Sequence, residues 1–157
     1  PMQANGSVSA AESHAWHRPL LAKRASQYDP RVRSRIERGA TMSASDYIDL
    51  LNARQHWIVR MEAALAPYDA LLSPTVPLVA PPIADVAPGA ERDAEFFRVN
   101  ALLLRNTSVV NMLDGCALSL PCHMAGELPV GLMVWHGALH DDAVLNVGLQ
   151  IEQTLQK

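Results

Sequence analysis

Few residues in this sequence have the types and spacing that chemistry requires. His14 and His17 lie three residues apart and would share one face of a helix. No third ligand stands at a clear spacing from them, so ordinary surface histidines are favoured over a metal site. Cys122 and His123 are adjacent, but neighbouring side chains of an extended chain point to opposite faces, so adjacency does not make a thiol–base pair. We therefore expect no metal and no cofactor.

The standard motifs of hydrolases and nucleotide-binding proteins are also missing. The sequence has no glycine-rich phosphate loop, no Gly-x-Ser-x-Gly nucleophile turn and no Cys-x-x-Cys pair. Motif spacing alone therefore identifies no catalytic residue.

Arg54 is the charged residue whose position is most unusual. Ser43 and Asp46 have the spacing that opens a helix, and this helix should run to about Ala66, before a proline. Arg54 falls within its apolar stripe, whose other members are Tyr47, Leu51, Ile58, Met61 and Leu65. Burying an unpaired charge costs several kcal/mol, so the guanidinium either extends into solvent or binds an anionic partner.

Two shorter helices are expected before this one. Ser9 and Glu12 form a capping-box pattern, which predicts a helix that Pro19 ends or kinks. An Asp-Pro start and a glycine stop bound a short basic helix over residues 30–38. Residues 1–67 are thus expected to be mainly helical.

Residues 68–157 have a different character, with strands, a proline-rich loop and helices. The expected elements are a short strand at 70–72, an ordered loop rich in proline, a helix at 93–105, strands at 116–120 and 130–135, and a helix from about 141. The last two strands are joined by a loop that contains Gly126 and should pair as an antiparallel hairpin. The pattern predicts an α/β fold in which helices pack on a small mixed sheet.

Composition excludes several classes of protein. The 157 residues carry a net charge of -3 and are 49% hydrophobic, which is typical of a globular domain without a general attraction to nucleic acid or anionic lipid. The basic run over residues 18–38 is interpreted as a solvated helical surface, because no aromatic residues are interleaved with it. Two cysteines and no apolar run of membrane-spanning length favour a reduced cytoplasmic protein.

Four segments together resemble the amidase signature family. They are Tyr68–Pro77 with Ala80-Pro81, then Asn111–Cys122, and then Leu128–Met133. They are similar in order to the family's "Pro-Thr, Pro, Ala-Pro" stretch, its "Ala-Leu-Ser-Leu-Pro-Cys" strand and its "Leu-Pro-Val-Gly-Leu" return strand. Upstream, residues 28–39, residues 43–47 and Arg54 also fit in order. Cys116 stands where many relatives have proline, and His123 where many have glycine.

The resemblance implies an amide hydrolase with a serine nucleophile, a second serine in a cis peptide and a lysine base. The glycine- and serine-rich signature that carries both serines has no counterpart here, and the two lysines, Lys23 and Lys157, are poorly placed to be desolvated as bases. We therefore expect a single C-terminal segment of an amidase domain over residues 1–157, with a partial amidase-signature fold. It would complete the sheet and substrate cleft but have no catalytic residue and be inactive alone.

Two further expectations follow from the resemblance. In the A subunits of amidotransferases, which look related, an arginine at the place of Arg54 holds the substrate carboxylate, whereas their acidic residue for the substrate amine is replaced here by Leu104. The expected partners are the missing N-terminal portion, a small amide substrate in the complete enzyme and a second copy of the chain. The alternative is a noncatalytic interaction module on an amidase-derived scaffold.

Overall fold

A computed structural model describes residues 7–155 of the chain. Contacts between Cα atoms divide the chain into two compact units, Pro1–Trp57 and Ile58–Lys157. We call them the N-terminal unit and the C-terminal unit and describe each by itself.

The described residues of the N-terminal unit form helices and 3-10 turns joined by short connections. Its elements are α1 (Ser7–Arg24), the 3-10 turn η1 (Ala25–Gln27), α2 (Pro30–Glu37), the 3-10 turn η2 (Arg38–Thr41) and the first part of α3 (Ala44–Leu65). The prediction for α1 is wrong at its first residues, because Ser9 lies inside the helix. Pro19 does not end the helix either, because the helix continues to Arg24. Proline removes one hydrogen bond of the helix, and α1 packs on α2 and η2.

The starts of α2 and α3 are fixed by local hydrogen bonds, as the sequence predicts. Asp29 Oδ1 accepts from the backbone N–H of Arg31 at 2.9 Å and of Val32 at 3.1 Å. At α3, Asp46 N donates to Ser43 Oγ at 3.1 Å, and Ser43 N donates to Asp46 Oδ2 at 3.1 Å. The Ser43 side chain, and then its backbone N–H, hold the pKa of the Asp46 carboxyl below its usual value.

Gly39 lies where η2 meets α1. A Cβ atom on Gly39 would collide with the backbone carbonyl of Ala10 and would lie 2.8 Å from the Cβ of His14. Ala10 and Gly39 are both buried. The predicted glycine stop is therefore not what ends the basic helix, because α2 ends at Glu37 and Gly39 lies within η2. Glycine at position 39 instead permits close packing of η2 on α1.

The C-terminal unit contains a three-stranded sheet and the helices around it. Its elements are the end of α3, β1 (Leu71–Pro74), α4 (Ile83–Val86), the 3-10 turn η3 (Ala90–Arg92), α5 (Asp93–Arg105), α6 (Thr107–Leu113), β2 (Cys116–Pro121), β3 (Gly131–His136) and α7 (Asp141–Leu155). The predicted helix at 93–105, the hairpin and the last helix are confirmed. Helix α6 was not expected.

The strand order is β1-β3-β2. Leu72 and Leu118 both lie opposite Val134 in the ladder. Both pairings are antiparallel, so the described sheet is not mixed as expected. The reason is that β1 and β2 run in the same direction but are not neighbours: β3 lies between them and runs opposite to both, and the long connection from β1 to β2 crosses over its position.

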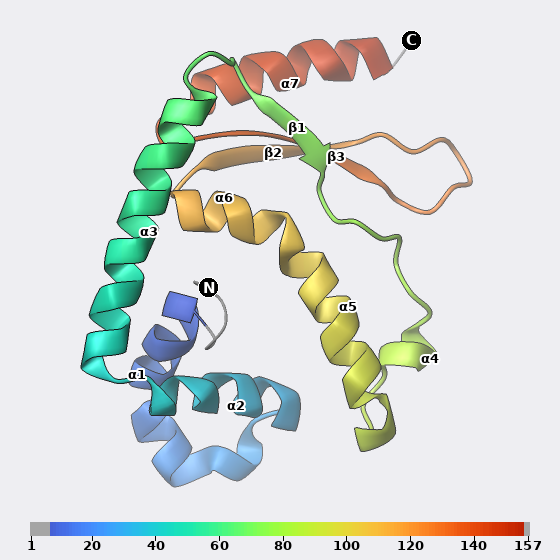
Figure 1. Ribbon diagram of the computed structural model, residues 1–157. Helices are drawn as coiled ribbons and strands as arrows, with labels where there is room; N and C mark the ends of the chain where they lie inside the picture. Colours follow the sequence, from blue (N-terminus) through green and yellow to red (C-terminus); the bar gives the residue numbers. More distant parts are fainter. Residues whose placement is uncertain (1–6, 156–157) are drawn as a thin grey trace. The chain divides into compact units, whose positions relative to one another are not determined.

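The two faces of the sheet are covered by different helices (Figure 1). On one face α7 packs its Val144 against Leu120 and Val134, with Leu118, Val147 and Ile151 around them. Figure 1 shows α6 on the opposite side of the sheet, where alternation along β3 places Met133 and Trp135. Met133, Val134 and Trp135 are all buried, so β3 is the centre of the core. Among the described residues, no helix has the length and apolar character to cross a bilayer.

We predict that Gly39→Ala destabilises the protein by about 1–3 kcal/mol, because the added methyl group must displace backbone atoms of α1. Urea unfolding followed by circular dichroism measures the loss. Gly137→Ala is the matched control, since its Cβ would meet only Glu62 Cγ at 3.9 Å, and it should change stability by less than about 0.5 kcal/mol. Equal stability of the two variants would contradict the close packing described for Gly39.

Candidate substrate-cleft wall

Arg54 lies on α3 in the N-terminal unit and is half-buried. Along the same stripe of the helix, Leu51 is 38% exposed and Ile58 is 8% exposed. The apolar stripe predicted from the sequence is therefore only partly covered near Arg54. Solvent screens a half-buried guanidinium less than a fully exposed one. A half-buried guanidinium beside apolar side chains therefore attracts a carboxylate more strongly.

The segments that resemble the amidase signature family meet at one end of the sheet. Thr75 follows β1, Ser119 lies in β2 and Gly131 begins β3. Thr75 N donates to Gly131 O at 2.8 Å, which extends the ladder beyond β1. Thr75 Oγ1 and Ser119 Oγ are hydrogen-bonded at 2.6 Å.

This pair of hydroxyls crosses over the backbone of Gly131. A Cβ atom on Gly131 would lie 2.7 Å from both oxygens. The "Leu-Pro-Val-Gly" stretch thus has glycine at the start of β3, where the side chains of Thr75 and Ser119, from the two flanking segments, meet over the backbone of β3. The arrangement presents hydroxyl groups, which can donate to or accept from a polar ligand.

Other contacts hold this end of the sheet in place. Asn106, between α5 and α6, donates from Nδ2 to Pro74 O at 2.7 Å. Asp114 has a left-handed backbone with φ 55° and ends α6 just before β2. Ser73 Oγ and Trp135 Nε1 are buried, and neither has a hydrogen-bond partner among the residues that the structure describes.

The cysteine and histidine candidates are bound elsewhere. Cys122 Sγ contacts Val130 O at 3.5 Å, and Val130 N donates to His123 Nδ1 at 3.4 Å, so both side chains bond the same backbone residue. Cys116 and Cys122 are free thiols. His17 Nδ1 is 2.8 Å from the Tyr28 hydroxyl, and no group of three or more metal-ligating side chains occurs within residues 7–155.

The basic run over residues 18–38 is mostly solvent-exposed, as predicted. Arg33 pairs with Glu37 at 2.9 Å, and most of the other basic side chains of the run are exposed. Arg31 is the exception, because it is 8% exposed.

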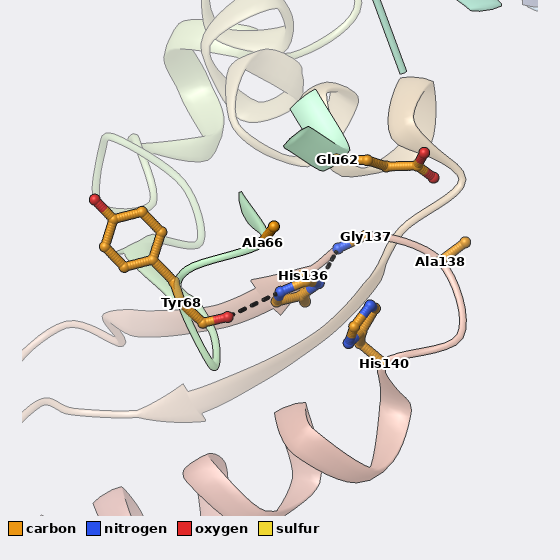
Figure 2. A pocket seen from close by; sticks show the side chains of 7 residues that line it. All are labelled: Glu62, Ala66, Tyr68, His136, Gly137, Ala138 and His140. Atoms are coloured by element: carbon orange, nitrogen blue, oxygen red, sulfur yellow. Dashed lines mark hydrogen bonds between the residues drawn. The ribbon is translucent and has the colours of Figure 1, made fainter. Parts of the chain in front are cut away.

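A second site was not predicted from the sequence. A cavity of about 300 Å³ in the C-terminal unit is lined by Glu62, Ala66, Tyr68, His136, Gly137, Ala138 and His140 (Figure 2). His136 is 4% exposed, and its ring is 3.8 Å from that of His140, centroid to centroid. The sequence contains no motif that marks this site. His136 ends a strand and His140 precedes a helix, and it is the loop between them that brings their rings together.

We predict that Gly131→Ala breaks the Thr75–Ser119 hydrogen bond and destabilises the chain by about 1–3 kcal/mol, because the methyl group occupies the space of both hydroxyls. The same substitution in a Thr75→Ala, Ser119→Ala background should cost clearly less. Urea unfolding of the four proteins forms the cycle that isolates this coupling. An unchanged cost in the second background would show that the hydroxyl pair is not what Gly131 accommodates.

Comparison with known proteins gives one consistent result. The Amidase family model matches residues 2–145. Among curated relatives, a 2-amino-5-chloromuconic acid deaminase of Comamonas testosteroni is 26% identical over 148 residues, covering 94% of this chain and 31% of the relative. The A subunit of the glutamyl-tRNA(Gln) amidotransferase of Salinispora tropica is 30% identical over 141 residues, covering 87% and 27%.

Solved structures agree with the sequence relatives. A crystal structure of an amidase superposes with a TM-score of 0.76 at 26% identity, covering 98% of this chain and 36% of that one. The urea amidolyase of K. lactis superposes with a TM-score of 0.72 at 26% identity, covering 89% and 8%. The chain thus spans about a third or less of the proteins it matches, and over that span it belongs to the amidase family.

Proposed function

We propose that this chain is the C-terminal part of a cytoplasmic amide-bond hydrolase and is inactive by itself. Residues 1–157 would form one segment of an amidase domain, with both compact units belonging to it. The observation that carries the proposal is the family match over residues 2–145, combined with coverage of only 31% and 27% of two curated relatives. The segment would supply a wall of the substrate cleft.

The positions of the two lysines support the proposal that the catalytic base lies outside this chain. A lysine acts as a base near neutral pH only when burial or a neighbouring cation lowers its pKa. Lys23 is exposed in the last turn of α1, and Lys157 is the other lysine of the sequence. The Ser, cis-Ser and Lys groups that the resemblance implies would come from the remaining two thirds of the enzyme.

Unpartnered surfaces of the C-terminal unit also support it. Leu145 and Leu149 follow the buried Val144 and Gly148 of α7, yet they are 57% and 52% exposed. Side chains spaced four residues apart form a stripe on one side of a helix, so α7 has a second apolar side. The N-terminal portion of the amidase, or a second copy of the chain, would cover such a surface.

Arg54 would act as a clamp for a substrate carboxylate in the complete enzyme. Its support is the half-buried position in an apolar stripe and the bidentate geometry that a guanidinium offers to a carboxylate. Leu104 is 41% exposed on α5 and offers no charge to a substrate amine. A general amidase is therefore favoured over part of a glutamine amidotransferase, and the substrate would be a small amide that also carries a carboxylate.

We predict that the isolated chain hydrolyses no simple carboxamide, and that mixing it with an N-terminal amidase portion carrying the serine signature restores hydrolysis. The physical reason is that nucleophile, base and oxyanion donors must be present in one site. Ammonia release from a panel of carboxamides measures the activity.

The control is the same N-terminal portion with its nucleophilic serine replaced by alanine. Binding without activity by the intact portion would favour the noncatalytic interaction module. Turnover by the isolated chain, in proportion to its concentration, would reject the proposal.

In the complemented or full-length enzyme, Arg54→Ala should raise KM for a carboxylate-bearing amide roughly ten- to hundredfold, the range expected for losing a charge-assisted hydrogen bond. The KM for a neutral amide of similar size should change little. Arg60→Ala is the matched control, because Arg60 is an exposed arginine on the same helix. Equal effects of the two substitutions would leave Arg54 with a packing role only.

A further inference from the structure

The cavity lined by Glu62, His136 and His140 contains none of the residues to which the proposed function assigns a role. Its lining residues all belong to the C-terminal unit. The side chains come from the end of α3, from the end of β3 and from the residue that precedes α7 (Figure 2). A volume of about 300 Å³ is at the lower end of the range for small-molecule pockets.

His136 is held in one tautomer by two backbone groups. The backbone N–H of Gly137 donates to its Nδ1 at 2.7 Å, so Nδ1 carries no proton. The Nε2 atom lies 3.2 Å from Tyr68 O, and a carbonyl oxygen can only accept, so Nε2 carries the proton. Both nitrogens are therefore used, and His136 offers the cavity only the apolar face of a neutral ring.

Two polar side chains of the cavity remain available. Neither the Glu62 carboxylate nor the His140 imidazole has a hydrogen-bond or ion-pair partner among the described residues. His140 is exposed and lies against His136 with a tilt of 33° between the rings. A neutral imidazole has one nitrogen that accepts a hydrogen bond, and a carboxylate accepts several.

The charged residues in and near the cavity determine which charge a bound ligand should carry. The lining contains Glu62 and, among the described residues, no arginine or lysine. Asp141 and Asp142 follow His140 in the first turn of α7, and Asp69 follows Tyr68. None of these three aspartates lines the cavity, so it is the Glu62 carboxylate in the lining that repels an anion and favours a cation.

We propose that this cavity binds a small primary alkylammonium ion. Its ammonium group donates hydrogen bonds to the Glu62 carboxylate and to the free imidazole nitrogen of His140. Its short alkyl chain lies against the methyl groups of Ala66 and Ala138 and the ring face of His136. An alcohol of the same length lacks the positive charge, and an acid of the same length is repelled by the carboxylate.

The test is a titration of the isotope-labelled chain with n-propylammonium chloride, followed by the NMR signals of the imidazole C–H groups. The comparison ligands are 1-propanol and sodium propionate, with sodium chloride holding the ionic strength constant. The signals of His136 and His140 should shift and saturate with propylammonium only. The signals of His14, which lies in the N-terminal unit, should not.

Glu62→Gln should weaken propylammonium binding about fivefold or more, the effect of removing one partly exposed ion pair with its hydrogen bond. Glu152→Gln, an exposed substitution on α7 outside the cavity, is the matched control and should leave binding unchanged. Circular dichroism checks that both variants are folded. The proposal is overturned if no saturable shift occurs, if propanol or propionate binds equally well, or if the two variants bind alike. None of these outcomes depends on amide hydrolysis.

Discussion

The pairing of β3 with both of its neighbours is the constraint on which the C-terminal unit depends. Residues 71–74 and residues 116–121 are far apart in sequence, and both form antiparallel ladders with residues 131–136. A central strand can pair its backbone groups on both sides, and the last four residues of β3, Met133 to His136, are buried. Alternation along this strand then assigns Val134 to α7 and Met133 with Trp135 to the opposite face.

The same ladder determines where polar groups can gather. At one end of β3, Gly131 lets Thr75 and Ser119 meet above the backbone. At the other end, His136 enters a cavity where two backbone groups fix its ring. The strand thus separates two polar regions by a buried apolar centre. A separation of this kind allows one region to face a cleft in a larger enzyme while the other acts as an independent binding site.

Features governed by neighbouring residues could be predicted from the sequence. The capping residues Asp29 and Ser43, the helix at 93–105 and the hairpin all depend on local patterns, and the structure has them. Helix α1 departs from its prediction because it begins before Ser9 and continues through Pro19 to Arg24. Helix α6 was missed because it has only seven residues and follows α5 after a single residue, Asn106. Strand direction was missed because it depends on a pairing between distant segments.

Gly148 has a consequence for how the molecule assembles. It lies within α7, and a Cβ atom there would collide with the Leu118 side chain of β2. Glycine inside a helix costs about 1 kcal/mol relative to alanine, and a helix of fifteen residues is marginal on its own in water. The last segment of the chain therefore gains its helical order mainly from the strands beneath it. The stability of α7 is therefore coupled to the formation of the hairpin on which it packs.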